Sequence, residues 1–211
     1  MPDETPWRDI DTFHHDSLIE LLSKWQLDGL FTPSEVKQLS LAWHHLPPWP
    51  GTVQGLQLLG SRYQTVGLSN ANQAILQDLN SQKGVVDDNS GSSSPPLGFQ
   101  RLLSCDMYKA YKPNPKVYQG ALRDLGLQPG EVAMVAAHLG DLQAAKKEGL
   151  RAVYVAQPGE LDFDGDDDKL KKAREWVDVW VEEGEGGMVE AARRLGINAD
   201  VDVADVSGVL G

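Results

Sequence analysis

The sequence predicts an α/β protein in which a parallel sheet is flanked by helices and preceded by a small helical cap. Short apolar segments alternate with segments of helical periodicity through most of the chain, which is typical of βαβ units. A wholly helical stretch comes first, and a proline-rich connector at 47–51 separates it from the alternating part. The 211 residues are enough for one core domain and a small cap.

Residues 1–46 are predicted to form the helical cap, incomplete at its N-terminal end. Leu18, Leu22 and Trp25 recur at helical spacing behind Asp16-Ser17, which we interpret as the start of the first helix. Thr32 precedes Pro33-Ser34-Glu35 and is the expected N-cap of a second helix. The prolines that follow cannot continue a helix, so we place the domain boundary there.

Residues 47–211 are predicted to form the α/β core. Its expected strands are 63–68, 102–105, 132–136, 151–155 and 176–181, and its expected helices are 52–60, 70–80, 116–125, 142–148 and 189–195. Residues 83–98 are rich in Gly, Ser, Asp and Pro and predict a mobile surface insertion. The acidic stretch 162–168 is interpreted as a solvated loop, because its spacing does not fit a calcium loop.

Composition excludes several classes of function. The net charge is −12 and no lysine or arginine cluster stands out, so we expect no nucleic-acid partner. No stretch is long and apolar enough for a membrane span, and the N-terminus does not resemble a signal peptide. The single cysteine, Cys105, excludes an internal disulfide and fits a reducing cytosol. We therefore expect a cytoplasmic protein with a small-molecule partner and a structural thiol at Cys105.

Polar side chains follow the predicted strands, where open α/β sheets place ligand-handling groups. Ser69 and Asn70 offer a hydroxyl, an amide and free backbone N–H groups to an anion, although either could simply cap a helix. Lys112 precedes a proline and can hold a carboxylate or phosphate as a point charge, although it could be a surface lysine. Asp141 can orient water, pair with Lys112 or cap a helix, and His138 can titrate near neutrality.

Three segments then carry a family resemblance. Leu68-Ser69-Asn70, Ala110 to Tyr118 and Val135 to Leu142 resemble the second, third and fourth motifs of the haloacid dehalogenase (HAD) superfamily. The sequence is most similar to the L-2-haloacid dehalogenase (type II) branch in its fungal-type form. The resemblance implies a HAD-like Rossmannoid core with a helical cap. It also implies cleavage of the carbon–halogen bond of small L-2-haloacids through an aspartyl ester, without a metal.

The resemblance also assigns parts to individual residues. Ser69 and Asn70 would hold the substrate carboxylate and help form the halide cradle. Lys112 would pair with the nucleophile, Tyr118 would stabilise the site, and Asp141 would orient Lys112 and the hydrolytic water.

The first motif of the family, which supplies the nucleophilic aspartate on an apolar strand, has no match before Trp7. Asp9-Ile10-Asp11-Thr12 matches the Asp-x-Asp-Thr pattern of this motif, but it follows Pro-Trp-Arg rather than a β-branched run. We therefore expect the nucleophile strand to be absent from this chain. The gap predicts either a homodimer or a sheet rearranged around it.

The fourth motif also departs from the family pattern. Ala136 and Ala137 replace serines, His138 replaces an asparagine, and Gly140 takes a position often held by tryptophan. His138 would then face an altered substrate pocket. Two alternatives to the dehalogenase therefore stay open: a catalytically inactive remnant that acts as a binding protein, and a small-molecule phosphatase that would require magnesium.

Overall fold

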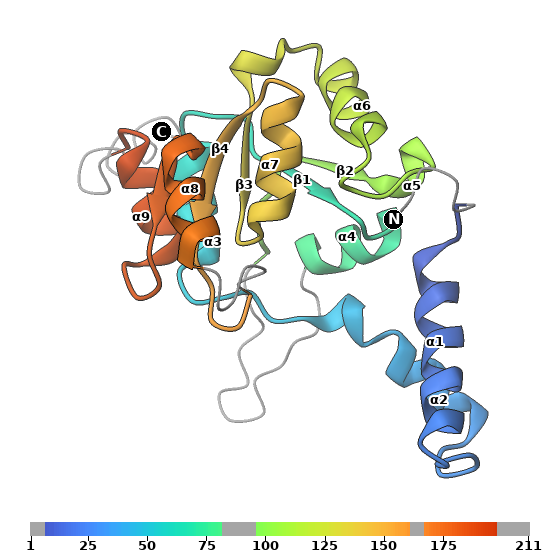
Figure 1. The fold of residues 1–211 in the computed structure, drawn as a ribbon. Coiled ribbons are helices and arrows are strands. Elements are labelled where there is room, and N and C mark those ends of the chain that lie inside the picture. Colours follow the sequence, from blue (N-terminus) through green and yellow to red (C-terminus); the bar gives the residue numbers. More distant parts are fainter. Residues whose placement is uncertain (1–6, 82–95, 161–166, 198–211) are drawn as a thin grey trace, which may run out of the picture.

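The computed structural model describes residues 7–81, 96–160 and 167–197 of the chain. The predicted mobile insertion and acidic loop lie almost wholly outside these residues. None of the helices in the three ranges has the length and apolar character needed to cross a membrane. The described part has two regions, a helical arm formed by the N-terminal segment and an α/β core formed by the rest (Figure 1).

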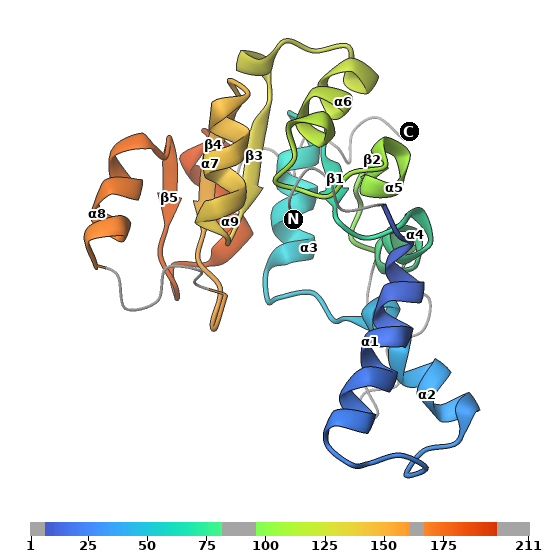
Figure 2. The same ribbon diagram turned by 45° about the vertical axis from the view of Figure 1, so that its right-hand side comes forward.

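The helical arm consists of α1 (Ile10–Lys24), α2 (Pro33–Ser40) and the 3-10 helix η1 (Ala42–His45). The predicted start of the first helix at Asp16-Ser17 is wrong. The helix begins more than one turn earlier, at Ile10, because the Asp9 side chain caps it by accepting a hydrogen bond from Thr12 N at 3.0 Å. The predicted N-cap of the second helix is confirmed, and Thr32 and Glu35 form a reciprocal capping box. The arm projects away from the strands in two views (Figures 1 and 2).

Within the described residues the core has five parallel strands, which form two separate sheets. One sheet pairs β1 (Val66–Ser69) with β2 (Arg101–Ser104). The other has the order β3 (Ala133–Ala136), β4 (Arg151–Val155) and β5 (Val179–Val181). The predicted parallel α/β class is confirmed, but the strands seen in residues 7–81, 96–160 and 167–197 do not join into one sheet. Both views place the edge strands β1 and β3 nearest each other (Figures 1 and 2).

Helices connect the strands. They are α3 (Thr52–Gly60), α4 (Gln73–Ser81), α5 (Cys105–Tyr108), α6 (Pro115–Leu125), η2 (Pro129–Glu131), α7 (Leu139–Lys147), α8 (Asp167–Trp176) and α9 (Gly187–Arg194). The sequence analysis did not predict α8, and the strand expected at 176–181 is shortened to β5. The segment is helical because Leu170, Ala173 and Trp176, spaced by three, pack against the core.

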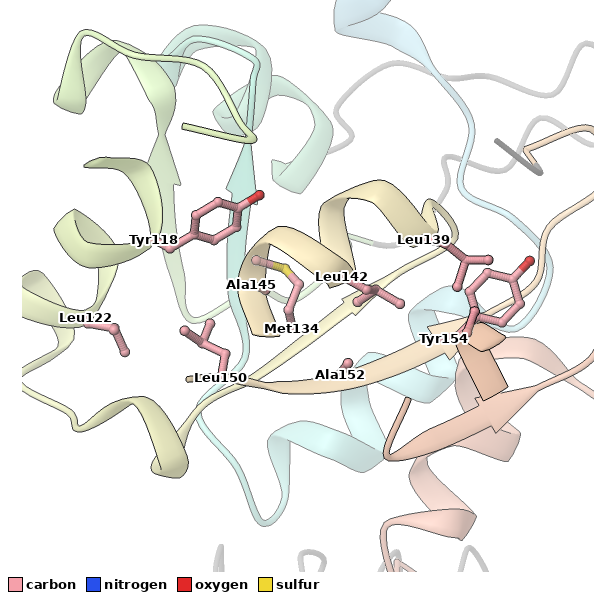
Figure 3. Packing of buried hydrophobic residues seen from close by; sticks show 10 residues of the cluster. Tyr118, Leu122, Met134, Leu139, Leu142, Ala145, Leu150, Ala152 and Tyr154 are labelled. Atoms are coloured by element: carbon pink, nitrogen blue, oxygen red, sulfur yellow. The ribbon is translucent and has the colours of Figure 1, made fainter. Parts of the chain in front are cut away.

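The larger sheet separates two apolar layers. Ala152 and Tyr154 of β4 belong to a cluster with α6, α7 and α8 (Figure 3), while Val153 and Val155 pack with α9 on the opposite side. This alternation is the period-2 pattern of a strand buried on both faces. Helix α3 crosses α9 so closely that a Cβ at Gly55 would lie 2.5 Å from the carbonyl carbon of Met188. Val135 and Ala136 at the carboxyl end of β3, just before α7, pack against the two layers.

Candidate active site

The carboxyl ends of β1 and β3 meet at one lysine. Lys112 lies in the loop before α6, and its Nζ donates to the Leu68 carbonyl oxygen of β1 at 3.1 Å and to Asp141 Oδ2 at 2.6 Å. Asp141 is in the first turn of α7, directly after β3. The two side chains are only 17% and 16% exposed, so their attraction is less screened than that of a surface pair. The ammonium is therefore held at the point where the two sheets converge.

Asn70 holds the backbone of Lys112 in place. Its Oδ1 accepts a hydrogen bond from Lys112 N at 2.7 Å, and its Nδ2 donates to Lys112 O at 3.3 Å. The buried Cys105 thiol also donates to Asn70 Oδ1, at 3.1 Å, and burial raises the pKa of this thiol to about 11. A thiol of this kind is uncharged near neutral pH, which agrees with a structural part for Cys105.

Tyr118 supports the other oxygen of the carboxylate. Its hydroxyl donates to Asp141 Oδ1 at 2.6 Å from α6, and the residue is fully buried. Burial raises the pKa of Tyr118, and the bond to Asp141 raises it further. The phenol therefore stays protonated and keeps donating, so that Asp141 is fixed between a cation and a hydroxyl.

Two predicted site residues lie at the edge of this arrangement. Ser69 ends β1, and its hydroxyl oxygen accepts a hydrogen bond from Ala71 N at 3.1 Å, which leaves the O–H able to donate. His138 precedes α7, and its Nε2 lies 3.1 Å from a carboxylate oxygen of Glu160. The imidazole is 54% exposed. The part of His138 in substrate binding stays a prediction.

Asp9 and Asp11, which resemble the first motif, form no ion pair with Lys112 in the described part of the chain, where Lys112 pairs with Asp141. The Asn72 amide donates to Asp11 Oδ2 at 2.8 Å and to Asp9 Oδ1 at 3.3 Å, while its oxygen accepts from Ile75 N at 2.9 Å. Asn72 therefore joins the start of α1 to the start of α4. The sequence analysis missed this residue, although an asparagine directly before a helix is a recognisable N-cap signal.

No group of three or more His, Cys, Asp or Glu within the described ranges is arranged to hold a metal ion. The site is instead a fixed cation and a fixed carboxylate, with a hydroxyl and an amide at the end of β1. A cation beside a carboxylate can bind a small anion and orient a water molecule. Parallel strands that end in such groups define the class of α/β proteins that bind a ligand at the carboxyl edge of the sheet.

Comparison with known proteins gives the family. Residues 9–149 match the family model of a haloacid dehalogenase-like hydrolase, so the chain belongs to this family. (S)-2-haloacid dehalogenase 4A of Burkholderia cepacia is 33% identical over 123 residues, which are 58% of this chain and 49% of that protein. (S)-2-haloacid dehalogenase 1 of Pseudomonas sp. (strain CBS-3) is 31% identical over 131 residues, 60% of this chain and 52% of that protein.

A solved structure extends the likeness to most of the chain. A crystal structure of an L-2-haloacid dehalogenase has a TM-score of 0.73 and 30% identity, and the alignment covers 92% of this chain and 76% of that one. The predicted resemblance to the L-2-haloacid dehalogenases is therefore confirmed at the level of family and fold. The chain spans about half the length of the two bacterial proteins named above.

Proposed function

We propose that this site cleaves the carbon–halogen bond of small L-2-haloacids by way of an aspartyl ester. The observation that carries the proposal is the Lys112 ammonium, fixed by Asp141 and by the Leu68 carbonyl where β1 and β3 converge. A fixed cation lowers the energy of a carboxylate nucleophile and of a carboxylate substrate held beside it. The relatives named as haloacid dehalogenases support the same chemistry.

The attacking carboxylate would be carried by a strand that pairs between β1 and β3. Both are edge strands of parallel sheets, and edge strands have backbone groups available for another strand. Among the described residues, Asp141 is the carboxylate bonded to Lys112, and Tyr118 binds it as well. Asp141 is thus occupied as a positioning group, which leaves the attack to a second carboxylate beside the ammonium.

The proposed reaction has two steps. A carboxylate oxygen attacks the carbon that bears the halogen, the new C–O bond forms, and the halide leaves with the electron pair of the broken bond. Water oriented by Asp141 then attacks the ester carbonyl, which releases the 2-hydroxy acid and a proton and regenerates the carboxylate. Ser69 and the second N–H of the Asn70 amide would hold the substrate carboxylate.

The test is halide release from L-2-chloropropionate by two proteins: the 211-residue chain, and the same chain extended at its N-terminus by an apolar strand ending in aspartate. We expect release by the extended protein and its loss in Lys112→Ala and in Asp141→Ala, with unchanged circular dichroism. Lys116→Ala is the matched lysine control and should retain activity. Turnover that persists in Lys112→Ala would refute the assignment.

A binding role without turnover is the second candidate. It is favoured by the hydrogen bonds that Asp141 accepts from Lys112 and Tyr118. These bonds fix Lys112 as a binding site for an anion, and they occupy the carboxylate beside it, so that Asp141 does not act as the attacking group. Calorimetric binding of L-lactate by the 211-residue chain, together with no halide release from either protein, would support this candidate over the hydrolase.

A further inference from the structure

The helical arm is joined to the core by a polar cluster where α1, η1 and α4 meet. His44 of η1 lies at its centre. Its Nδ1 is 2.7 Å from Asp78 Oδ2 of α4, and its Nε2 is 3.2 Å from Asp11 Oδ1 of α1. The imidazole is only 10% exposed, whereas the Asp11 and Asp78 side chains are 27% and 56% exposed. One ring therefore bridges three elements that are far apart in the sequence.

Both nitrogens of the ring face acceptors, and this geometry determines the protonation state that satisfies them. A neutral imidazole carries one N–H, so it can donate to one of the two carboxylates and presents a lone pair to the other. The imidazolium carries two N–H groups and donates to both. Only the protonated ring of His44 therefore donates a hydrogen bond to both Asp11 and Asp78.

The surroundings favour this charged form. Burial lowers the pKa of His44, but the hydrogen bonds and charges of Asp78 and Asp11 outweigh it and raise the pKa above its ordinary value. A protonated His14 of α1 repels the His44 imidazolium, but burial lowers the pKa of His14 and so disfavours the charged form of His14.

In the described ranges His44 forms its ion pairs with Asp11 and Asp78, and the other titratable groups on the surrounding elements make different contacts. His45 is the neighbouring side chain on η1, with ring centroids 6.3 Å apart. On α2, Glu35 bonds to the Thr32 N-cap, and neither it nor Lys37 bonds to His44 in the described part of the chain. Asp9, at the start of α1, accepts a hydrogen bond from the Asn72 amide. Asp11 and Asp78 therefore dominate the electrostatics at His44.

The same cluster is continuous with the loop that carries the site. Asn72, which binds Asp11, also caps α4 and lies two positions after Asn70. The Tyr111 hydroxyl donates to the Arg8 carbonyl just before α1, and Tyr111 precedes Lys112. The contacts that hold the arm therefore end on the two loops that position Asn70 and Lys112.

We propose that His44 is a proton-controlled clasp between the helical arm and the core. The imidazolium joins Asp11 of α1 to Asp78 of α4, and loss of the proton releases one of these contacts and loosens the arm. Because the pKa is raised on folding, the stabilisation is fully present below the ordinary histidine pKa of 6.5 and is lost as the pH rises through the folded value. The clasp does not depend on turnover at Lys112.

Hydrogen exchange of the native 211-residue chain tests the clasp. Exchange rates of the α1 and η1 amides, corrected for the intrinsic effect of pH, are compared at about pH 6 and about pH 8.5, on either side of the histidine range. We expect severalfold faster exchange in the arm at the higher pH, with β4 unchanged. In His44→Gln the arm should exchange fast at both values.

His45→Gln is the matched control, since this exposed neighbour bridges no carboxylates, and it should behave like the unmodified chain. Asp78→Asn is a second variant at an exposed position that should fold normally and show a smaller pH dependence. A pH-independent arm in the unmodified chain, or a pH dependence that survives in His44→Gln, would overturn the proposal. An NMR titration that places the His44 pKa at or below 6.5 would do the same.

Discussion

The ammonium of Lys112 lies 2.6 Å from the carboxylate of Asp141, although 28 residues separate the two in the sequence. Lys112 belongs to the loop that follows the two-stranded sheet, and Asp141 to the first turn of the helix that follows β3. The pair therefore links the two sheets at the edge where a ligand would bind. Its partly buried position has consequences for stability as well as for binding.

Removing one partner of this pair should destabilise the fold. The two side chains are about one-sixth exposed, so we expect Lys112→Met to cost about 1–3 kcal/mol, between the values of a surface pair and a buried pair. Urea unfolding of both single variants and of Lys112→Met/Asp141→Asn gives the coupling energy. Lys146→Met, which breaks a pair that is about twice as exposed, is the control and should cost less. Additive effects of the two substitutions would contradict the pairing.

Tyr118→Phe should lower stability because it leaves Asp141 with one bond fewer in a buried position. A hydrogen bond to a charged group contributes about 1.5–3 kcal/mol, and we expect a loss in this range from urea unfolding. Tyr108→Phe is a suitable control, since its hydroxyl donates to the exposed Asp124 at 2.9 Å. The hypothesis fails if both variants lose the same amount.

Local patterns were enough to predict many of the elements. The strand at 151–155 is confirmed to the residue, because its apolar run is short, contains two valines and is bounded by Gly149 and Pro158-Gly159, which favours a strand over a helix. Helix α8 is not predicted, although Leu170, Ala173 and Trp176 have a helical spacing, because these residues stand among charged side chains directly after an acidic stretch. The division into two sheets could not be seen in the sequence, since periodicity predicts strands but not which edges pair.

The candidate site shows the same limit. The polar residues after the strands were recognisable one by one, but the bonds from Asn70 to the backbone of Lys112 join positions 42 residues apart. Such contacts depend on how the loops fold over one another. The cluster around His44 was missed for this reason, because Asp11 and Asp78 lie 33 and 34 residues from it.

Asp178 should make the fold sensitive to acid. Burial raises the pKa of this carboxylate, but hydrogen bonds from Ala152 N at 2.7 Å and from Lys146 outweigh it and lower the pKa below 3.8. A lowered pKa stabilises the fold above pH 3.8, and this contribution is lost as the pH falls through the folded value. Asp178→Asn should therefore destabilise the protein at neutral pH and reduce the loss of stability in acid.

Urea unfolding at about pH 7 and about pH 3 measures this dependence. Glu183→Gln, which removes one carboxylate from an exposed turn, is the control and should leave both values unchanged. An acid dependence that is identical in Asp178→Asn and in the unmodified chain would rule out this role.

The surface of the helical arm predicts self-association. Of the thirteen large apolar side chains that are exposed in the described ranges, eleven lie between residues 13 and 49, and Trp25 and Leu30 are 70% and 62% exposed. Helix α1 has no buried residue at all. Apolar side chains concentrated in this way mark interaction surfaces, and we propose that a second copy of the chain covers them in a homodimer.

Sedimentation of the 211-residue chain should therefore show a dimer. Trp25→Glu and Leu30→Glu each place a charge in the proposed interface and should shift the protein towards the monomer. Met107→Glu is the matched control, since Met107 is 50% exposed but belongs to the core region, and it should sediment like the unmodified chain. A monomeric unmodified chain at high concentration would refute the homodimer, and equal dissociation by all three variants would place its interface elsewhere.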